Sequence, residues 1–234
     1  EATRLVVEWA RRGESRMVCC ASVNNVMQAC EAPAFRALMN AADLVTPDGM
    51  PLVWGLRRLG VPAAGRVYGP ELMRRLLGAA AAAGLPVGFY GATEAVLARL
   101  RAAVHTRHPE LSIRYYYAPP FRPLTPEEDA RITEAIRASG IRILFVGLST
   151  PKQEHWMAAH RGRVPAVMLG VGAAFDFLAG TKPQAPGWMQ RAGLEWLFRL
   201  ATEPRRLGPR YLKQNPRFLA LFSFELAGLR RYKA

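Results

Sequence analysis

An aspartate stands in the sharpest turn that the sequence predicts. The apolar pair Leu44-Val45 is followed by Thr46-Pro47-Asp48-Gly49, after which a second apolar run begins. Pro47 restricts the preceding residue to extended backbone, and Gly49 accepts angles that other residues avoid. The segment therefore predicts a strand end, a turn and a helix start. There the Asp48 carboxylate would face the ligand crevice of an open α/β sheet and could act as a general base, although an Asp before Gly is also an ordinary turn residue.

A second candidate for chemistry is the segment 147–154, which has the sequence GLSTPKQE. It follows an apolar strand-like run and opens a helix-like stretch. The free N–H groups of a helix start, together with Lys152, would suit an anion. The spacing is not that of a Walker loop, which is G-x-x-x-x-G-K-[ST]. The alternative is a capped helix with a solvated face of Lys152, Gln153 and Glu154.

The segment 170–176, GVGAAFD, also follows a strand-like run. It starts like a dinucleotide fingerprint, but Phe175 stands where the third glycine belongs, and Glu195, at about the right distance for a ribose-binding acid, is in a helix-like stretch. A nucleotide-dependent oxidoreductase is thereby disfavoured. A tight turn at Gly172 approaching some ligand, with Asp176 accepting a hydrogen bond from a sugar or base, stays open.

Histidine and cysteine spacing predicts no metal site. His155 and His160 are five residues apart, and no H-E-x-x-H or C-x-x-C motif occurs. The odd cysteine count, with Cys19 and Cys20 in an apolar run, argues against a disulfide framework and favours a reducing cytoplasmic compartment. The histidines are expected to be surface or core residues.

The elements that would position these residues alternate between strand and helix, which predicts βαβ units and a largely parallel sheet with helices on both faces. Thr93 and Thr125 are expected N-caps, and Glu128 completes a capping box with Thr125. Strands are expected at 17–20, 44–45, 87–91, 113–117, 143–147 and 166–170, and helices at 3–12, 24–40 with a break near Pro33, 70–83, 93–107, 152–161 and from Thr125 on.

The charge of the chain predicts an anionic partner. Its 234 residues carry 32 Lys and Arg against 18 Asp and Glu, a formal charge of +14. Phosphate, nucleic acid or an acidic membrane surface would each fit. No apolar run approaches the roughly 20 residues that span a bilayer. The sequence leaves open whether residues precede Glu1.

The composition changes near Gly180. Residues 181–234 hold eleven Lys and Arg against three Glu, together with many Trp, Phe and Leu side chains. Basic helices with such apolar faces are typical of membrane-surface helices, while the alternative is a helical subdomain packed on the core. We expect two domains, an α/β core at 1–180 and a basic, aromatic helical appendage at 181–234.

Five segments of the chain, which occur in the order they have in the family, resemble the WecG/TagA/CpsF family of bacterial glycosyltransferases. The resemblance runs from about Met17 to about Tyr211. The segments are 42–53 (ADLVTPDGMPLV), 66–73 (RVYGPELM), 145–154 (FVGLSTPKQE), 170–180 (GVGAAFDFLAG) and 193–200 (GLEWLFRL) with Glu203-Pro204.

The resemblance implies a fold and a reaction. The fold is a Rossmann-like core, called GT-E, with an appendage that closes over the site and contacts the membrane. The reaction is an inverting, metal-independent and cofactor-free transfer of a sugar, N-acetylmannosamine in the best-known members, from a UDP-sugar to undecaprenyl-diphosphate-linked N-acetylglucosamine. The enzyme would lie on the inner face of the cytoplasmic membrane, and the resemblance leaves a homo-oligomer open.

The resemblance also implies residue roles. Asp48 would be the general base, Gln153 and Arg66 pocket residues, and Asp176 would lie at the nucleotide end. Appendage arginines would hold the diphosphate and supply the countercharge that a metal supplies elsewhere. These arginines are Arg199, Arg206 and, with a shift of one residue left open, Arg210; Lys152 and Gly172 are further binding candidates.

One departure concerns the sugars. Cys20 takes the place of a family threonine at the end of the first strand, with Ser22 or Asn24 as substitutes for its polar contact. A glucosyl- or uronosyltransferase of exopolysaccharide synthesis is therefore an alternative. A basic nucleic-acid-binding protein is a more distant one, because no recognition helix, zinc spacing or RNA-binding strand motif is found.

Overall fold

The computed structural model describes residues 1–227. Three basic residues of the predicted appendage, Arg230, Arg231 and Lys233, lie outside the described part. The chain divides into two compact units, each made of several stretches. The first comprises Glu1–Cys20, Ala41–Val45 and Val67–Pro183; the second comprises Ala21–Asn40, Thr46–Arg66 and the described residues from Gln184 on. The division at residue 180 that the composition suggested stays a prediction.

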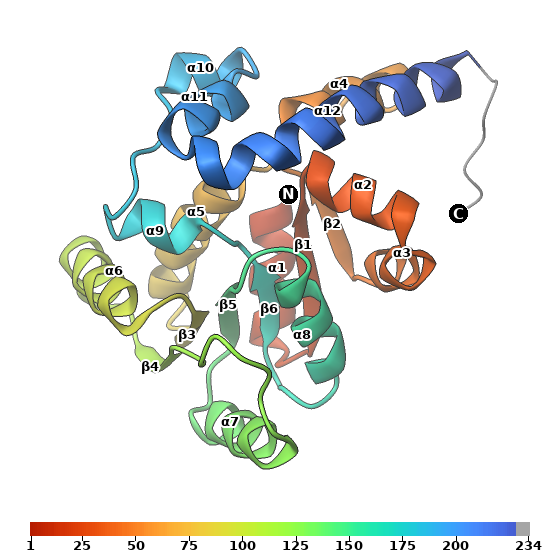
Figure 1. Cartoon of the computed structure of the whole chain (residues 1–234). Helices are drawn as coiled ribbons and strands as arrows, with labels where there is room; N and C mark the ends of the chain where they lie inside the picture. Colours follow the sequence, from red (N-terminus) through yellow and green to blue (C-terminus); the bar gives the residue numbers. More distant parts are fainter. Residues whose placement is uncertain (228–234) are drawn as a thin grey trace. The chain divides into compact units, whose positions relative to one another are not determined.

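A sheet of six parallel strands dominates the first unit, in the order β2-β1-β6-β5-β3-β4. The largely parallel α/β sheet predicted from the sequence is thus confirmed (Figure 1). The last residues of β1 and β2 are assigned to the second unit. The strands are β1 (Arg16–Ala21), β2 (Leu44–Pro47), β3 (Val87–Gly91), β4 (Ile113–Tyr117), β5 (Ile143–Gly147) and β6 (Val167–Gly170).

Helices cover both faces of this sheet. Successive side chains of a strand point to opposite faces. On β3, Phe89 contacts Phe175 of α9 edge to face, at 5.7 Å between ring centroids, whereas Tyr90 stacks on Trp156 of α8 at 4.3 Å. Helices α8 and α9 therefore lie on opposite faces. The helices of this unit are α1 (Ala2–Arg11), α5 (Gly69–Ala82), α6 (Glu94–Arg107), α7 (Pro126–Ala138), α8 (Lys152–His160) and α9 (Ala174–Leu178).

The core of the first unit lies on the α9 side of the sheet. Helices α1, α5, α6 and α9 pack against one another there, over apolar strand residues such as Phe89 and Phe145, which stack at 5.8 Å. The central strands β3, β5 and β6 are buried along almost their whole length. This is why they appear in the sequence as continuous apolar runs rather than as alternating ones.

The second unit is helical in its described part and contains α2 (Val23–Glu31), α3 (Pro33–Asn40), α4 (Met50–Arg58), α10 (Gly187–Arg191), α11 (Glu195–Thr202) and α12 (Pro204–Leu226). The predicted break near Pro33 is confirmed. Helix α12 runs beside α2 and α4 (Figure 1), where Arg217 forms an ion pair with Glu31 and the Phe222 ring lies against Gly55. Residues far apart in the sequence are thus joined into one helical layer.

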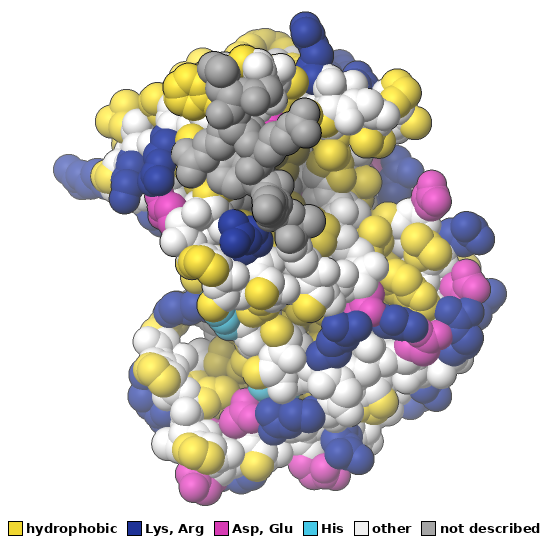
Figure 2. All heavy atoms as spheres, turned by 90° about the vertical axis from the view of Figure 1, so that its right-hand side faces the viewer, with side chains coloured by type: hydrophobic (Ala, Val, Ile, Leu, Met, Phe, Trp, Pro, Cys, Tyr) yellow, Lys and Arg dark blue, Asp and Glu magenta, His cyan; other side chains and the backbone are white. Residues whose placement is uncertain are grey.

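Most of the large hydrophobic side chains that are exposed among the described residues belong to this second unit. They are Trp54, Leu59, Val61, Trp188, Trp196, Leu197, Leu212, Leu219, Phe224 and Leu226. On the face drawn in Figure 2, Lys and Arg side chains are scattered among hydrophobic ones. Within residues 1–227, none of the helices is both long enough and apolar enough to cross a membrane.

Candidate active site

The Asp48 turn has the structure that the sequence predicts. Strand β2 ends at Pro47, and α4 starts at Met50 with Gly49 as its N-cap. The Asp48 amide donates a hydrogen bond to the carbonyl oxygen of Ala21, at 2.8 Å, which fixes the turn. The Asp48 side chain is 24% exposed, so its carboxylate is accessible from solvent.

Arg66 joins Asp48 to Glu195 within the second unit. Its Nε donates to the carbonyl oxygen of Asp48 at 2.5 Å, and its Nη2 lies 3.7 Å from Asp48 Oδ1. The same Nη2 donates at 2.5 Å to Oε2 of Glu195, which is the first residue of α11. The guanidinium of Arg66 therefore contacts both Asp48, the predicted base, and Glu195, a residue of the predicted appendage.

Glu195 lies in a helix, as the sequence indicated when it disfavoured a dinucleotide site. It is the first residue of α11 and binds Arg66, a contact that the sequence did not predict. The signal that could have found it is the segment 193–200, which carries the family resemblance and places an acid directly before an amphipathic helix.

The polar substitutes proposed for the family threonine lie at the start of α2. Both the amide and the hydroxyl of Ser22 donate to Asn25 Oδ1, at 3.0 and 2.9 Å. Asn25 is almost fully buried, and sequence reasoning missed it, whereas Asn24 is half-buried. The amide and hydroxyl of Ser22 therefore take part in capping α2. In the first unit, Cys20 is buried beside Gly69.

In the first unit, Gln153 at the start of α8 and Gly172 in the segment after β6 lie together, each following one of the neighbouring strands β5 and β6 in the chain. Gln153 is 4% exposed; its Oε1 accepts from the Gly172 amide and its Nε2 donates to Glu154 Oε1, both at 3.1 Å. Thr150 also donates to this Glu154 oxygen, at 2.9 Å. A side chain at Gly170 would come within 3.0 Å of the Gln153 amide, which explains why glycine ends β6. The amide orientation is thus fully determined by its partners.

Two further predicted binding residues of the first unit, Asp176 and Lys152, lie on α9 and α8. Asp176, on α9, accepts from the Thr181 hydroxyl at 3.2 Å and has Lys182 Nζ at 3.8 Å. Its carboxylate therefore lies over the turn that ends α9. Lys152, at the first position of α8, is exposed, whereas Gln153 and Glu154 are buried, so the alternative of a solvated face holds for the lysine alone.

The three predicted diphosphate-binding arginines lie on α11 and α12. Arg206 Nε donates to Glu203 Oε2 at 2.6 Å, and the guanidinium of Arg210 lies over the ring of Tyr211, 5.3 Å from its centroid. Among the described residues, the buried Nε of Arg210 lacks a hydrogen-bond partner. Arg199 occupies the last turn of α11.

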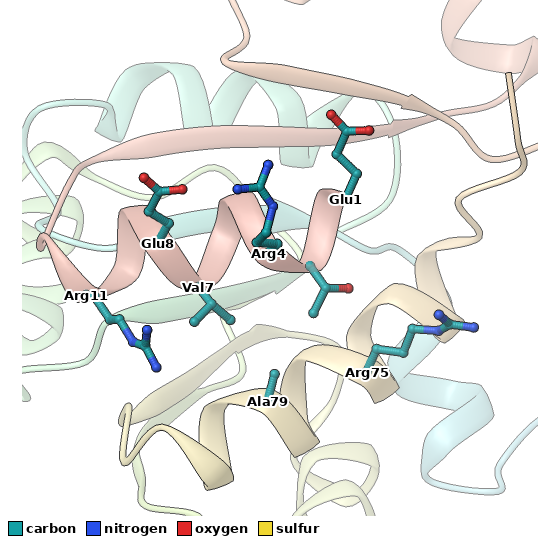
Figure 3. A pocket seen from close by; sticks show the side chains of 8 residues that line it. Glu1, Arg4, Val7, Glu8, Arg11, Arg75 and Ala79 are labelled. Atoms are coloured by element: carbon teal, nitrogen blue, oxygen red, sulfur yellow. The ribbon is translucent and has the colours of Figure 1, made fainter. Parts of the chain in front are cut away.

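A groove elsewhere in the first unit has a volume of 620 Å³ and lies between α1 and α5 (Figure 3). Its lining includes Arg4, Val7, Glu8 and Arg11 of α1 with Arg75 and Ala79 of α5, and Figure 3 shows Val7 and Arg11 directed toward α5. None of the predicted site residues lines it. Within residues 1–227, no cluster of three His, Cys, Asp or Glu side chains could hold a metal ion.

A parallel sheet flanked by helices, with polar side chains in the segments after its strands, is the architecture of Rossmann-like α/β proteins. The chain belongs to the glycosyl transferase WecG/TagA/CpsF family, whose description it matches over residues 1–232. The chain is therefore a glycosyltransferase, as the five sequence segments predicted.

Two curated relatives of the chain share the name N-acetylglucosaminyldiphosphoundecaprenol N-acetyl-beta-D-mannosaminyltransferase. The Staphylococcus aureus protein is 30% identical over 199 residues, which cover 85% of this chain and 74% of that protein. The Bacillus spizizenii protein is 32% identical over 183 residues, covering 76% of this chain and 68% of that protein. The site residues discussed above stay predictions.

Proposed function

We propose that the chain transfers a sugar from a UDP-sugar to a polyprenyl-diphosphate-linked sugar, with inversion at the anomeric carbon and without a metal ion or other cofactor. The names of its relatives support the acceptor class, because those proteins act on N-acetylglucosaminyldiphosphoundecaprenol. N-acetylmannosamine is the proposed donor sugar, and glucose or a uronic acid are the alternatives within the family.

The observation that carries the proposal is the Asp48 turn. Its carboxylate is accessible, directly follows a strand and has its main chain held by Ala21 and Arg66. In the proposed step, Asp48 takes the proton of the acceptor hydroxyl while the hydroxyl oxygen bonds to the anomeric carbon of the donor. The bond from that carbon to the UDP oxygen breaks, and UDP leaves with the electron pair.

The departing diphosphate needs positive countercharge. We propose that Arg199, Arg206 and Arg210 supply it, because guanidinium groups bind phosphate oxygens through paired, charge-assisted hydrogen bonds. The Arg210 Nε that lacks a partner in the described residues is available for such a bond. Gln153, Gly172 and Asp176 are proposed to hold the nucleotide part of the donor, with Lys152 as a further cation.

The acceptor is carried by a lipid, so the enzyme has to work at a membrane. The exposed hydrophobic side chains of the second unit and the surplus of positive charge support peripheral binding to an anionic membrane, proposed here to be the inner face of the cytoplasmic membrane. No nucleic acid partner is proposed. A homo-oligomer is compatible with this function.

The Asp48→Asn variant tests the proposal. Asparagine keeps the size and polarity of the turn residue but cannot accept the proton, so turnover should fall about 10²- to 10⁴-fold. The assay combines a short-chain polyprenyl-diphosphate-N-acetylglucosamine acceptor with a panel of UDP-sugars, and calorimetry measures UDP binding. We expect wild-type UDP affinity and an unchanged melting temperature.

Two results would contradict the proposal. Near-normal turnover of Asp48→Asn would remove Asp48 from the role of base. Failure of the wild-type enzyme to use any UDP-sugar, with no affinity for UDP, would remove the donor class. The panel also decides the sugar, for which the buried Cys20 makes a Cys20→Thr variant informative: a change of preferred donor in that variant would assign this position to sugar selection.

A further inference from the structure

The guanidinium of Arg66 is shared between two carboxylates in an unequal way. Its Nη2 lies 2.5 Å from Glu195 Oε2 but 3.7 Å from Asp48 Oδ1. Its Nε is directed to the main-chain carbonyl of Asp48 rather than to the carboxylate. Arg66 therefore anchors the backbone of the turn while its tight ion pair is made with Glu195.

This division matters for a proton acceptor. A carboxylate that receives close, charge-assisted hydrogen bonds from a guanidinium is a weaker base than one in a looser contact. The Arg66, Asp48 and Glu195 side chains are only 17, 24 and 14% exposed, so solvent screens these charges weakly. Without Glu195, the guanidinium would have the Asp48 carboxylate as a close anionic partner at the same Nη2.

The position of Glu195 is set by the packing around the turn that precedes it. Gly193 has φ +73°, and a β-carbon there would come within 2.7 Å of the Trp54 ring and 3.2 Å of Met50 Cβ. Met50 and Trp54 belong to α4, the helix that begins directly after the Asp48 turn. The turn before α11 is therefore packed on α4, so that Glu195 reaches Arg66 from a fixed backbone.

We propose that Glu195 is a positioning residue for the transfer reaction. It holds Arg66 on the main-chain carbonyl of Asp48 and keeps Nη2 3.7 Å from Asp48 Oδ1, so that the pair of Arg66 with the proposed base stays looser than its pair with Glu195. The proposal rests on the role of Asp48 as the base given under Proposed function. It also gives the residues after 180 a part in the chemistry that is separate from binding diphosphate or membrane.

The test compares Glu195→Gln and Glu195→Asp with Glu31→Gln. Glu31 pairs with Arg217 in the same unit, so its variant removes the same charge from another arginine pair. For Glu195→Gln we expect kcat to fall about ten- to hundredfold and KM for the UDP-sugar to stay within about threefold, because the loss concerns proton transfer. Glu195→Asp should recover part of kcat, and Glu31→Gln should stay within about twofold of wild type.

A crystal structure of Glu195→Gln supplies the second measurement. The distance between Arg66 Nη2 and Asp48 Oδ1, 3.7 Å here, should shorten to a direct ion pair, about 2.8 Å. The proposal is overturned if Arg66 keeps its position in that structure, or if Glu195→Gln retains kcat within about twofold while Asp48→Asn is inactive. An active Asp48→Asn variant would instead refute the assignment of the base.

Discussion

At the scale of single residues, His160 is a buried titratable group whose environment predicts a pH dependence. It is 1% exposed and stacks on Trp156, with 3.9 Å between ring centroids. Its Nδ1 lies 2.7 Å from the carbonyl oxygen of Trp156, and its Nε2 lies 3.0 Å from Asp129 Oδ1. Burial lowers the pKa of His160 below 6.5, and the nearby Arg163 acts in the same direction, while Trp156 and Asp129 oppose the shift.

The folded protein should therefore lose stability as the pH falls below about 6.5. The unfolded chain, with the higher histidine pKa, binds the proton first and is favoured by it. Urea unfolding at about pH 8 and about pH 5.5 measures the effect, with His160→Gln as a variant that does not titrate. His160→Gln should show a shallower loss of unfolding free energy over this range. Equal slopes for the two proteins would contradict the prediction.

The sequence could predict some of the site residues and not others, for a geometric reason. Asp48 directly follows β2. In the first unit, Gly172 lies two residues after β6 and Gln153 lies in the first turn of the helix that follows β5, and parallel strands end at one edge of a sheet. The contact between Gln153 and Gly172 follows from neighbouring strands. The pair of Arg66 and Glu195 spans 129 residues and depends on how helices pack, which no local pattern encodes.

At the scale of elements, helix α7 begins with a capping box that the sequence predicted and the structure confirms. The Glu128 amide donates to Thr125 Oγ1 at 3.2 Å, and Glu128 Oε2 accepts from the Thr125 amide at 2.9 Å. Arg122 donates to both carboxylate oxygens of Glu128, at 2.7 Å each. These bonds, the Arg122 pair first, lower the pKa of Glu128 to about 2.

Replacing the cap should destabilise the protein without touching the proposed chemistry. Thr125→Ala leaves an amide of the first turn without its acceptor and should lower the free energy of unfolding by about 1 kcal/mol. Denaturant unfolding measures it, and kcat should equal that of wild type. Because the pKa of Glu128 is lowered, its contribution is present above about pH 4.5 and is lost as the pH falls toward 2. An unchanged unfolding midpoint at neutral pH would contradict the role of the cap.

The length of helix α12 could not be predicted from the sequence. The basic and aromatic composition after residue 180 indicates helices, yet Pro209 and Pro216 would each be expected to end one. Both lie inside a single helix of 23 residues. Its contacts with α2 and α11 stabilise it despite the two missing N–H groups. Tertiary packing therefore decides the length of this element, and the sequence indicates only its helical character.

At the scale of the whole molecule, the sequence predicted an anionic partner from a formal charge of +14 without choosing among phosphate, nucleic acid and membrane. Membership of the glycosyltransferase family and the exposed hydrophobic side chains of the second unit favour the membrane. Non-specific nucleic-acid binding rests mainly on the contacts of Lys and Arg with phosphates, whereas a lipid surface also takes up apolar side chains. The two partners therefore differ in their response to the loss of exposed leucines.

Leu212 and Leu219 of α12 are 77 and 61% exposed and are seven residues apart, so they share one face of the helix. Burying a leucine side chain in an apolar phase contributes about 1.5–3 kcal/mol. The double variant Leu212→Ser, Leu219→Ser should therefore bind anionic liposomes at least about tenfold more weakly in a sedimentation assay. The matched control is Phe121→Ser in the first unit, where the side chain is 88% exposed, and it should bind like wild type. Turnover with a short-chain acceptor should stay at the wild-type level in both variants. Undiminished liposome binding by the double variant, or equal weakening by Phe121→Ser, would contradict membrane contact through α12.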